Sequence, residues 1–146
     1  MKNNYEQEYA IHAEINRRYD ESNGDEKIAE ACRAEHKALM DSIEAKGEVY
    51  AGGFRYFEDM KFRENKYIVI DECIFEDKAE GFINALKECG FTEFVYASTW
   101  SGSMEIAWLF TTFGCEIKGM VEVNGRFKGF PTEDWEKKHG LLISIN

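Results

Sequence analysis

Two helical units of equal length alternate with strand-like runs in the second half of the chain, and this alternation constrains the fold more than any other feature. The units run from Asp77 to Gly90 and from Ser101 to Gly114. Apolar runs rich in β-branched and aromatic residues flank them: Tyr67–Ile70, Phe94–Ala97 and Cys115–Val123. Because strand–helix–strand crossovers are right-handed, this series predicts a parallel sheet with helices packed against it.

Local signals predict the ends of these two helices. Asp77, with Glu80 three residues later, resembles a capping box, and Ser101 is expected to cap the second helix. Gly90 and Gly114 are expected to end the helices, because glycine readily adopts the left-handed conformation of a helix stop. The inner face of the second helix is predicted to comprise Met104, Ala107, Trp108 and Thr111.

The last part of the chain predicts a mixed sheet. Cys115–Val123 alternates apolar and charged residues, which is typical of a strand near a sheet edge with one face exposed to solvent. Asn124–Gly125 is a strong turn signal. A loop around Phe130–Pro131, a helical turn near Trp135 and a final strand at Leu141–Ile145 are expected to follow, with that strand antiparallel to a neighbour.

The first 66 residues predict helices. An aromatic stripe at helical spacing starts at Tyr5, and turn residues around Gly24 end that helix. A second helix is expected to start at Asp25 and to pack antiparallel on the first. The segment that follows, to about Phe62, is either the same helix bent near Gly47 or a third helix that meets it there.

The predicted fold class is therefore α/β, with α+β as the alternative. A helical hairpin or three-helix region over residues 1–66 is expected to pack on a small mixed sheet over residues 67–146 within a single domain. The chain has no hydrophobic signal segment near its start and no run approaching the ~18 apolar residues that a membrane span needs, so we expect a cytoplasmic protein that does not bind membranes.

The net charge of −10 is the strongest compositional fact. It argues against direct nucleic-acid binding, which requires clustered lysine and arginine, and it suits a protein that approaches a basic partner surface. Residues 1–66 contribute −4 and residues 67–146 contribute −6, so the acids are spread along the chain. A contiguous acidic face in three dimensions would favour partner binding, whereas evenly interspersed bases would count against it.

Cysteine and histidine spacing gives no sign of metal or nucleophile chemistry. The four cysteines stand far apart, as reduced and buried small hydrophobes do, and the three histidines lack the spacing of a zinc site. We therefore predict no metal site, no cofactor and no catalytic residue. Whether the protein is an enzyme stays open, with a non-enzyme favoured.

The turn after the second predicted strand is the candidate site. It lies where open α/β sheets bind ligands, at the carboxyl end of a strand and the start of a helix. Its hydroxyls offer donors and its tryptophan offers a ring, although the same residues serve as ordinary helix caps and as a plug for the sheet end. The candidate ligand or partner residues are Ser98, Thr99, Trp100, Ser101, Ser103 and Glu105.

Two further sets of residues have a structural and a functional interpretation. Asp71, Glu72 and Glu105 are either an acid or Mg²⁺ cluster at the sheet rim or, more commonly, solvated element ends. The tyrosines of the first helix belong either to the core or to an interface, since the tyrosine side chain combines an apolar ring with a hydroxyl that can face water. The candidate interface residues are Tyr5, Tyr9 and Tyr19.

The chain contains three distinctive motifs: the STWS turn at Ser98–Ser101, the ExAWLF helix at Glu105–Phe110, and GCxxxG followed by VEVN over Gly114–Asn124. These motifs resemble a family of small uncharacterised Firmicutes proteins found on plasmids, integrative elements and phage-like islands. Similar pieces are AKGEVYAGGFRYFED at Ala45–Asp59 and EKKHG at Glu136–Gly140, so the likeness spans roughly residues 40–146. The resemblance implies a bacterial cytoplasm and a mobile-element gene, and no catalytic residue.

Three functional hypotheses follow. The first is a non-enzymatic binding or inhibitor protein whose acidic and aromatic surface occupies a basic groove on a host protein, such as a defence or nucleic-acid-handling enzyme. The second is a small-ligand or nucleotide-binding domain, or an enzyme, centred on Ser98–Ser103. The third is a structural homodimer formed through the N-terminal hairpin.

Overall fold

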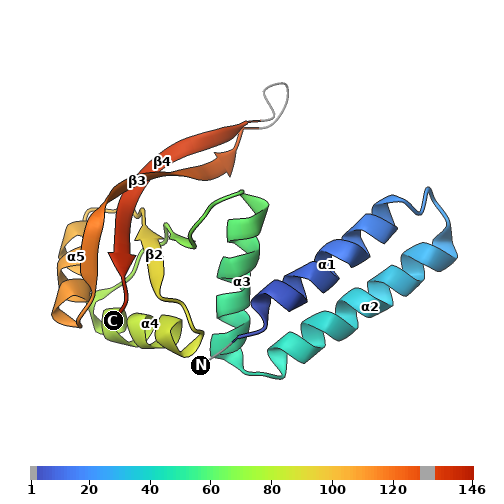
Figure 1. Cartoon of the computed structure of the whole chain (residues 1–146), viewed down its shortest axis with the longest axis horizontal. Coiled ribbons are helices and arrows are strands. Elements are labelled where there is room, and N and C mark those ends of the chain that lie inside the picture. The colour runs from blue at the N-terminus through green and yellow to red at the C-terminus, as the bar shows by residue number, and fades with distance from the viewer. Residues whose placement is uncertain (1–2, 129–133) are drawn as a thin grey trace.

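The computed structural model describes residues 3–128 and 134–146. Three helices come first, and a four-stranded sheet with two further helices follows (Figure 1). This arrangement confirms the predicted combination of an N-terminal helical region and a small mixed sheet. The elements are α1 (Tyr5–Asp20), α2 (Glu26–Glu44), α3 (Glu48–Phe62), β1 (Val69–Ile70), α4 (Glu76–Glu88), β2 (Glu93–Tyr96), α5 (Ser103–Thr112), β3 (Glu116–Phe127) and β4 (Trp135–Ser144).

Helices α1 and α2 form the predicted antiparallel hairpin, which extends away from the sheet (Figure 1). Asp25 caps α2 as expected, since its Oδ1 accepts hydrogen bonds from the backbone N–H groups of Lys27 at 3.1 Å and Ile28 at 3.4 Å. Gly47 separates α2 from α3 with φ of +110°, so the alternative of two helices meeting at this glycine is confirmed over that of one bent helix.

Helix α3 connects the hairpin to the sheet. One core cluster lies among the first three helices around Tyr5 and Phe54, and a second lies between the sheet and helices α4 and α5. Met60 and Phe91 pack against both clusters. The two parts of the molecule therefore share apolar side chains where they meet.

The strand order is β1-β2-β4-β3. β1 and β2 are parallel, as predicted, and the last strand is antiparallel to both of its neighbours, which makes the sheet mixed. β3 runs parallel to β2 and lies at the sheet edge, but β4 is inserted between them. β4 begins at Trp135, so the predicted helical turn near this residue is wrong. The pairing of Phe127 with Trp135 keeps the chain extended there.

Asn124–Gly125 forms no hairpin turn and instead lies within β3, next to an irregularity in the pairing with β4. The Asn124 amide donates to the Arg63 carbonyl at 2.8 Å, and its backbone exchanges two hydrogen bonds with the Asn65 side chain. A Cβ at Gly125 would lie 2.8 Å from the Lys138 side chain, so this glycine permits close packing. The predicted Phe130–Pro131 loop lies outside the described residues.

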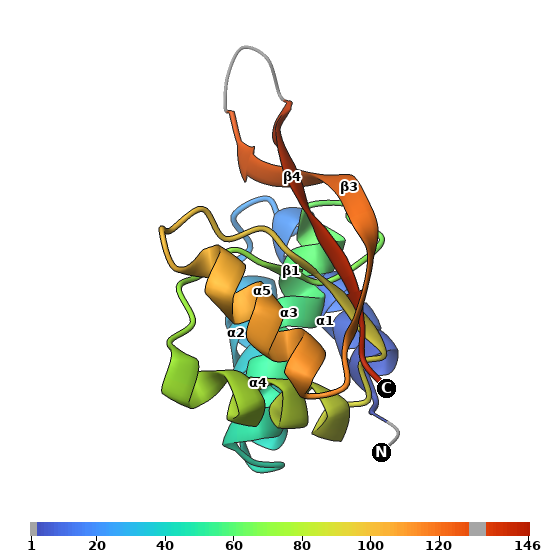
Figure 2. The ribbon, with the colours of Figure 1, turned by 90° about the vertical axis from the view of Figure 1, so that its left-hand side faces the viewer.

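Helices α4 and α5 lie side by side on one face of the sheet (Figure 2). Gly90 and Gly114 follow them with positive φ, which confirms the predicted stops. Their starts differ from the prediction, because α4 begins after Phe75 and α5 after Gly102, and neither helix has a side-chain cap. The capping predictions for Asp77 and Ser101 are therefore wrong.

Three of the cysteines are buried as predicted, but Cys73 is exposed in the loop before α4. Burial raises the pKa of the Cys115 thiol above its usual value. Within residues 3–128 and 134–146, none of the helices combines the length and the apolar character needed to cross a bilayer.

Candidate functional site

The turn at Ser98–Ser103 lies between β2 and α5, as predicted, but its tryptophan has a structural role. The Trp100 ring packs against the Gly102 backbone and meets Phe75 edge-on, with 6.0 Å between ring centroids. Its indole Nε1 is buried and has no hydrogen-bond partner among the described residues. Thr99 and Ser101 are exposed. Trp100 therefore closes the end of the core beneath the start of α5.

The carboxylates predicted at the sheet rim do not gather at one point. Asp71 faces Arg63 and Lys138, at 3.6 and 3.7 Å. Glu72 accepts a hydrogen bond from the Tyr56 hydroxyl, and burial together with this bond raises the pKa of Tyr56. No group of three or more potential metal ligands occurs among the residues that the structure describes.

Helix α5 turns a different side to the core than the sequence predicts. Ile106, Ala107 and Phe110 are buried, whereas Met104 is 81% exposed and Trp108 is 65% exposed. The sequence could not decide the orientation, because MEIAWLF is apolar on nearly every side of the helix. Placing Met104 and Trp108 inside was therefore wrong, and Thr111 is only partly buried.

These exposed side chains belong to one surface. Trp108 lies one helical turn after Met104, and Phe75, 61% exposed, reaches the start of α5 through its contact with Trp100. Exposed acidic side chains lie before α4, in its first turns and on α5. We call the surface of these two helices, whose ribbons Figure 2 shows, the α4–α5 face. It comprises Phe75, Met104 and Trp108 with Glu72, Glu76, Asp77, Glu80 and Glu105.

The acids of this region are not neutralised by bases. Between Glu72 and Glu105 the chain carries seven acids and only two lysines, so this segment has a net charge of −5, half of the total of −10. None of the seven carboxylates forms an ion pair with a described residue, although ion pairs are numerous elsewhere in the molecule. The carboxylates near the start of α4 and on α5 are therefore exposed and free of ion pairs within the described residues.

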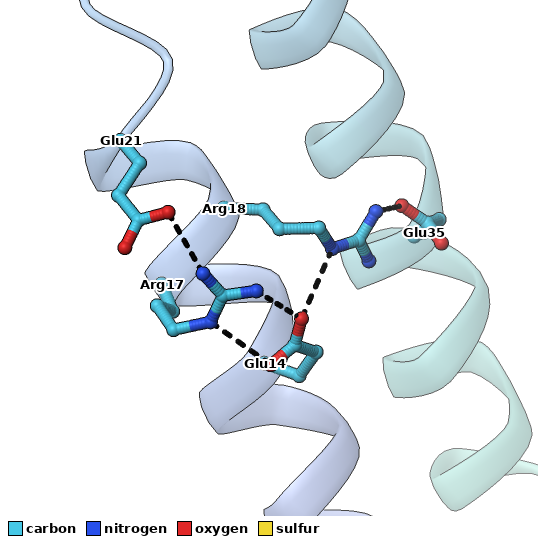
Figure 3. A network of polar contacts seen from close by, with 5 residues as sticks. All are labelled: Glu14, Arg17, Arg18, Glu21 and Glu35. Carbon is cyan, nitrogen blue, oxygen red and sulfur yellow. Dashed lines mark hydrogen bonds and ion pairs between the residues drawn. The ribbon is translucent and has the colours of Figure 1, made fainter.

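Several acids of the helical hairpin, by contrast, form ion pairs (Figure 3). Arg17 pairs with Glu14 and Glu21 on α1, and Arg18 joins α1 to α2 through Glu35 at 2.8 Å. Each exposed pair adds little stability. Residues 5–44 still carry 11 acids and 5 bases, so the hairpin surface remains acidic despite its ion pairs.

The tyrosines proposed as an interface have three different environments. Tyr5 is fully buried, and its hydroxyl donates to the Tyr50 carbonyl at 2.8 Å. Burial is the main cause that raises the pKa of Tyr5 well above its usual value. Tyr9 is partly buried and Tyr19 is exposed. Tyr5 thus belongs to the core, because its side chain fills the space among the helices, and its assignment to an interface is wrong.

Comparisons with known proteins define the extent of the family domain. Neither the curated proteins nor the solved structures include one that matches the chain. A family model matches residues 53–145, from within α3 to the end of the sheet, and therefore includes the whole α4–α5 face but neither α1 nor α2. By this match the chain belongs to the family described as Domain of unknown function (DUF7698).

Proposed function

We propose that this protein is a non-enzymatic binding protein whose α4–α5 face docks on a basic surface of another protein. The observation that carries the proposal is the exposed apolar side chains of Phe75, Met104 and Trp108, in a region whose carboxylates form no ion pair with a described residue. A soluble domain does not gain stability from an exposed tryptophan, and such side chains gathered within a charged rim are typical of interaction sites.

The two chemical components of the face have different roles in this proposal. The apolar side chains provide most of the affinity, because burying tryptophan and methionine at an interface removes apolar surface from water. The carboxylates attract a cationic partner over longer distances and reject acidic proteins. A lysine- or arginine-rich protein surface with an apolar centre satisfies both components.

The family resemblance supports a biological context for the proposal. A chain carried by a bacterial mobile element acts in the cytoplasm of its host, where enzymes that bind nucleic acid have basic grooves. An acidic protein that occupies such a groove inhibits the enzyme by competing with its substrate. We therefore propose a host defence or nucleic-acid-handling protein as the partner.

The test compares two variants with equally exposed aromatic residues at different places. Trp108 on α5 is 65% exposed and Phe62 at the end of α3 is 66% exposed. The wild-type chain is used to capture the partner from a host lysate, and the affinity of the purified partner is then measured calorimetrically. We expect Trp108→Ala to weaken binding by about 2 kcal/mol or more, which is roughly 30-fold, and Phe62→Ala to leave it unchanged.

Charge and salt provide the second arm. Glu105→Lys is expected to weaken binding, and raising the salt concentration is expected to slow association because it screens the attraction between the two surfaces. The proposal is refuted if captured proteins are acidic, if Phe62→Ala is as harmful as Trp108→Ala, or if the affinity is the same at low and high salt.

A further inference from the structure

A pocket of about 500 Å³ lies in the family domain, and none of its lining residues belongs to α4 or α5. The end of α3, the residue after β1 and the paired strands β3 and β4 form its walls. Its volume falls within the range of small-molecule sites, roughly 300–1,000 Å³. All of its lining residues lie within residues 53–145, so the pocket belongs to the family domain and not to the added hairpin.

One wall of the pocket is aromatic. Trp135 meets Phe62 nearly perpendicularly, with 5.5 Å between ring centroids, and meets Phe127 at 5.2 Å. Phe62 and Phe127 are largely exposed although each has an aromatic neighbour. The wall thus offers ring surface to a planar molecule, because offset or edge-on contacts between rings are favourable.

The polar side of the pocket is rich in hydrogen-bond donors. The side chains of Arg63 and Lys138 are mostly buried, and both approach the same oxygen of Asp71, at 3.6 and 3.7 Å. These distances exceed those of good hydrogen bonds, about 2.7–3.2 Å. Arg63 donates to Asp59 at 3.0 Å through Nε, which leaves its terminal N–H groups available to a ligand. Arg126 adds a third base to a lining that also holds the carboxylates of Asp59, Asp71 and Glu136. Asp59 and Asp71 already face Arg63 and Lys138, so the terminal N–H groups of Arg63 and the exposed guanidinium of Arg126 are the donors open to a ligand.

The pocket is held in place by contacts distant in sequence. Asn124 ties β3 to the loop after α3 through the Arg63 carbonyl and the Asn65 side chain, so the backbone that carries Arg63 is fixed against the sheet. Gly125 allows the Lys138 side chain to cross the strand at close range. A site whose donors are fixed before binding loses less entropy when a ligand enters.

We infer that this pocket binds a planar aromatic compound that carries an anionic oxygen group, either a phosphate or a carboxylate. The ring lies against Phe62 and Trp135, and the anionic oxygens accept hydrogen bonds from Arg63 and Arg126. Guanidinium and ammonium groups form their strongest hydrogen bonds with such oxyanions. This site is separate from the α4–α5 face and does not depend on the function proposed for it.

The test uses probes that separate the ring from the charge. Adenosine monophosphate carries a ring with a phosphate, and adenosine is its uncharged analogue. N-acetyl-tryptophan carries a ring with a carboxylate, and N-acetyl-tryptophanamide is its uncharged analogue. Inorganic phosphate carries only the charge. Calorimetric titration is expected to show that at least one of the two anionic ring compounds binds at least tenfold more tightly than its uncharged analogue and than inorganic phosphate. The compound that binds identifies phosphate or carboxylate as the preferred group.

Variants then locate the binding site. Phe62→Ala and Arg126→Gln, both at exposed positions, are each expected to weaken binding about tenfold, as loss of a stacking or charged contact does, while Trp108→Ala leaves it unchanged. Circular dichroism checks that each variant is folded. The inference is wrong if neither anionic compound binds at millimolar concentration, if the uncharged analogues bind equally well, or if Trp108→Ala matches the loss caused by Phe62→Ala.

Discussion

The orientation of α5 can be tested through two aromatic residues that lie two positions apart. Phe110 is fully buried, and its ring meets those of Phe94 at 5.6 Å and Tyr96 at 5.2 Å. Replacing a buried phenylalanine by alanine costs about 3–5 kcal/mol, because transfer energy is lost and a cavity remains. Phe110→Ala is therefore expected to lower the free energy of unfolding by that amount.

Trp108→Ala is expected to cost far less. Trp108 is 65% exposed, so only about a third of its side chain is removed from water. If tryptophan can bury roughly 200 Å², that third contributes less than about 2 kcal/mol at ~25 cal/mol per Å². This value is an upper limit, because unfolded chains already bury part of their apolar surface.

Urea unfolding followed by circular dichroism measures both effects. With a slope of about 2 kcal/mol per molar urea, Phe110→Ala shifts the midpoint by about 2 M and Trp108→Ala by less than about 1 M. The slopes of the two variants should match that of the wild type. If Trp108→Ala shifts the midpoint as far as Phe110→Ala, then α5 faces the sheet with the other side, and the α4–α5 face loses its apolar centre.

Three further substitutions test the helical region. Burial raises the pKa of Tyr5 above 10.0, so the folded protein holds this proton more tightly than the unfolded chain does. The contribution of this group to the free energy of unfolding should be fully present below about pH 10 and should decline above it. Tyr5→Phe should flatten this decline when urea unfolding is measured between about pH 9 and pH 11. Gly52→Ala should stabilise α3 by up to about 1 kcal/mol in a thermal melt, since open space surrounds the added methyl group. Gly53→Ala should destabilise it by about 1–3 kcal/mol, because the methyl group would overlap the Tyr5 hydroxyl and lie 2.6 Å from Cys89 Sγ. Equal effects of the two glycine substitutions, or stability unchanged up to pH 11, would contradict the packing described around Tyr5.

Local signals predicted the elements of this fold well. The period of apolar residues located the helices and the first two strands, and Gly90 and Gly114 marked helix ends that depend only on backbone conformation. The insertion of β4 depends on pairing between distant segments, which no local pattern encodes. The prediction of a hairpin turn at Asn124–Gly125 failed for the same reason, because the hydrogen-bond partners of Asn124 lie about 60 residues earlier in the chain.

The sequence pointed to the turn before α5 as a candidate site but did not show which side chains are exposed around it. Glu105 and the turn beside α5 border the exposed surface, whereas Trp100 belongs to the core end and Trp108 carries the surface instead. The ion pairing of the acids could not be predicted either, because it depends on which side chains lie close together in space. The pocket beside Trp135 could not be predicted, as its walls come from segments that the sequence separates by about 70 residues.

The position of β4 between β2 and β3 determines when the sheet can be completed during synthesis. β2 and β3 leave the ribosome before β4, and each needs β4 as its hydrogen-bonding neighbour. Until β4 emerges, β3 has no pairing partner and α5 packs on an incomplete layer. The nascent domain thus exposes unpaired strand edges until nearly its last described residue is made, which makes this interval the period when it is most prone to aggregation and most dependent on chaperones.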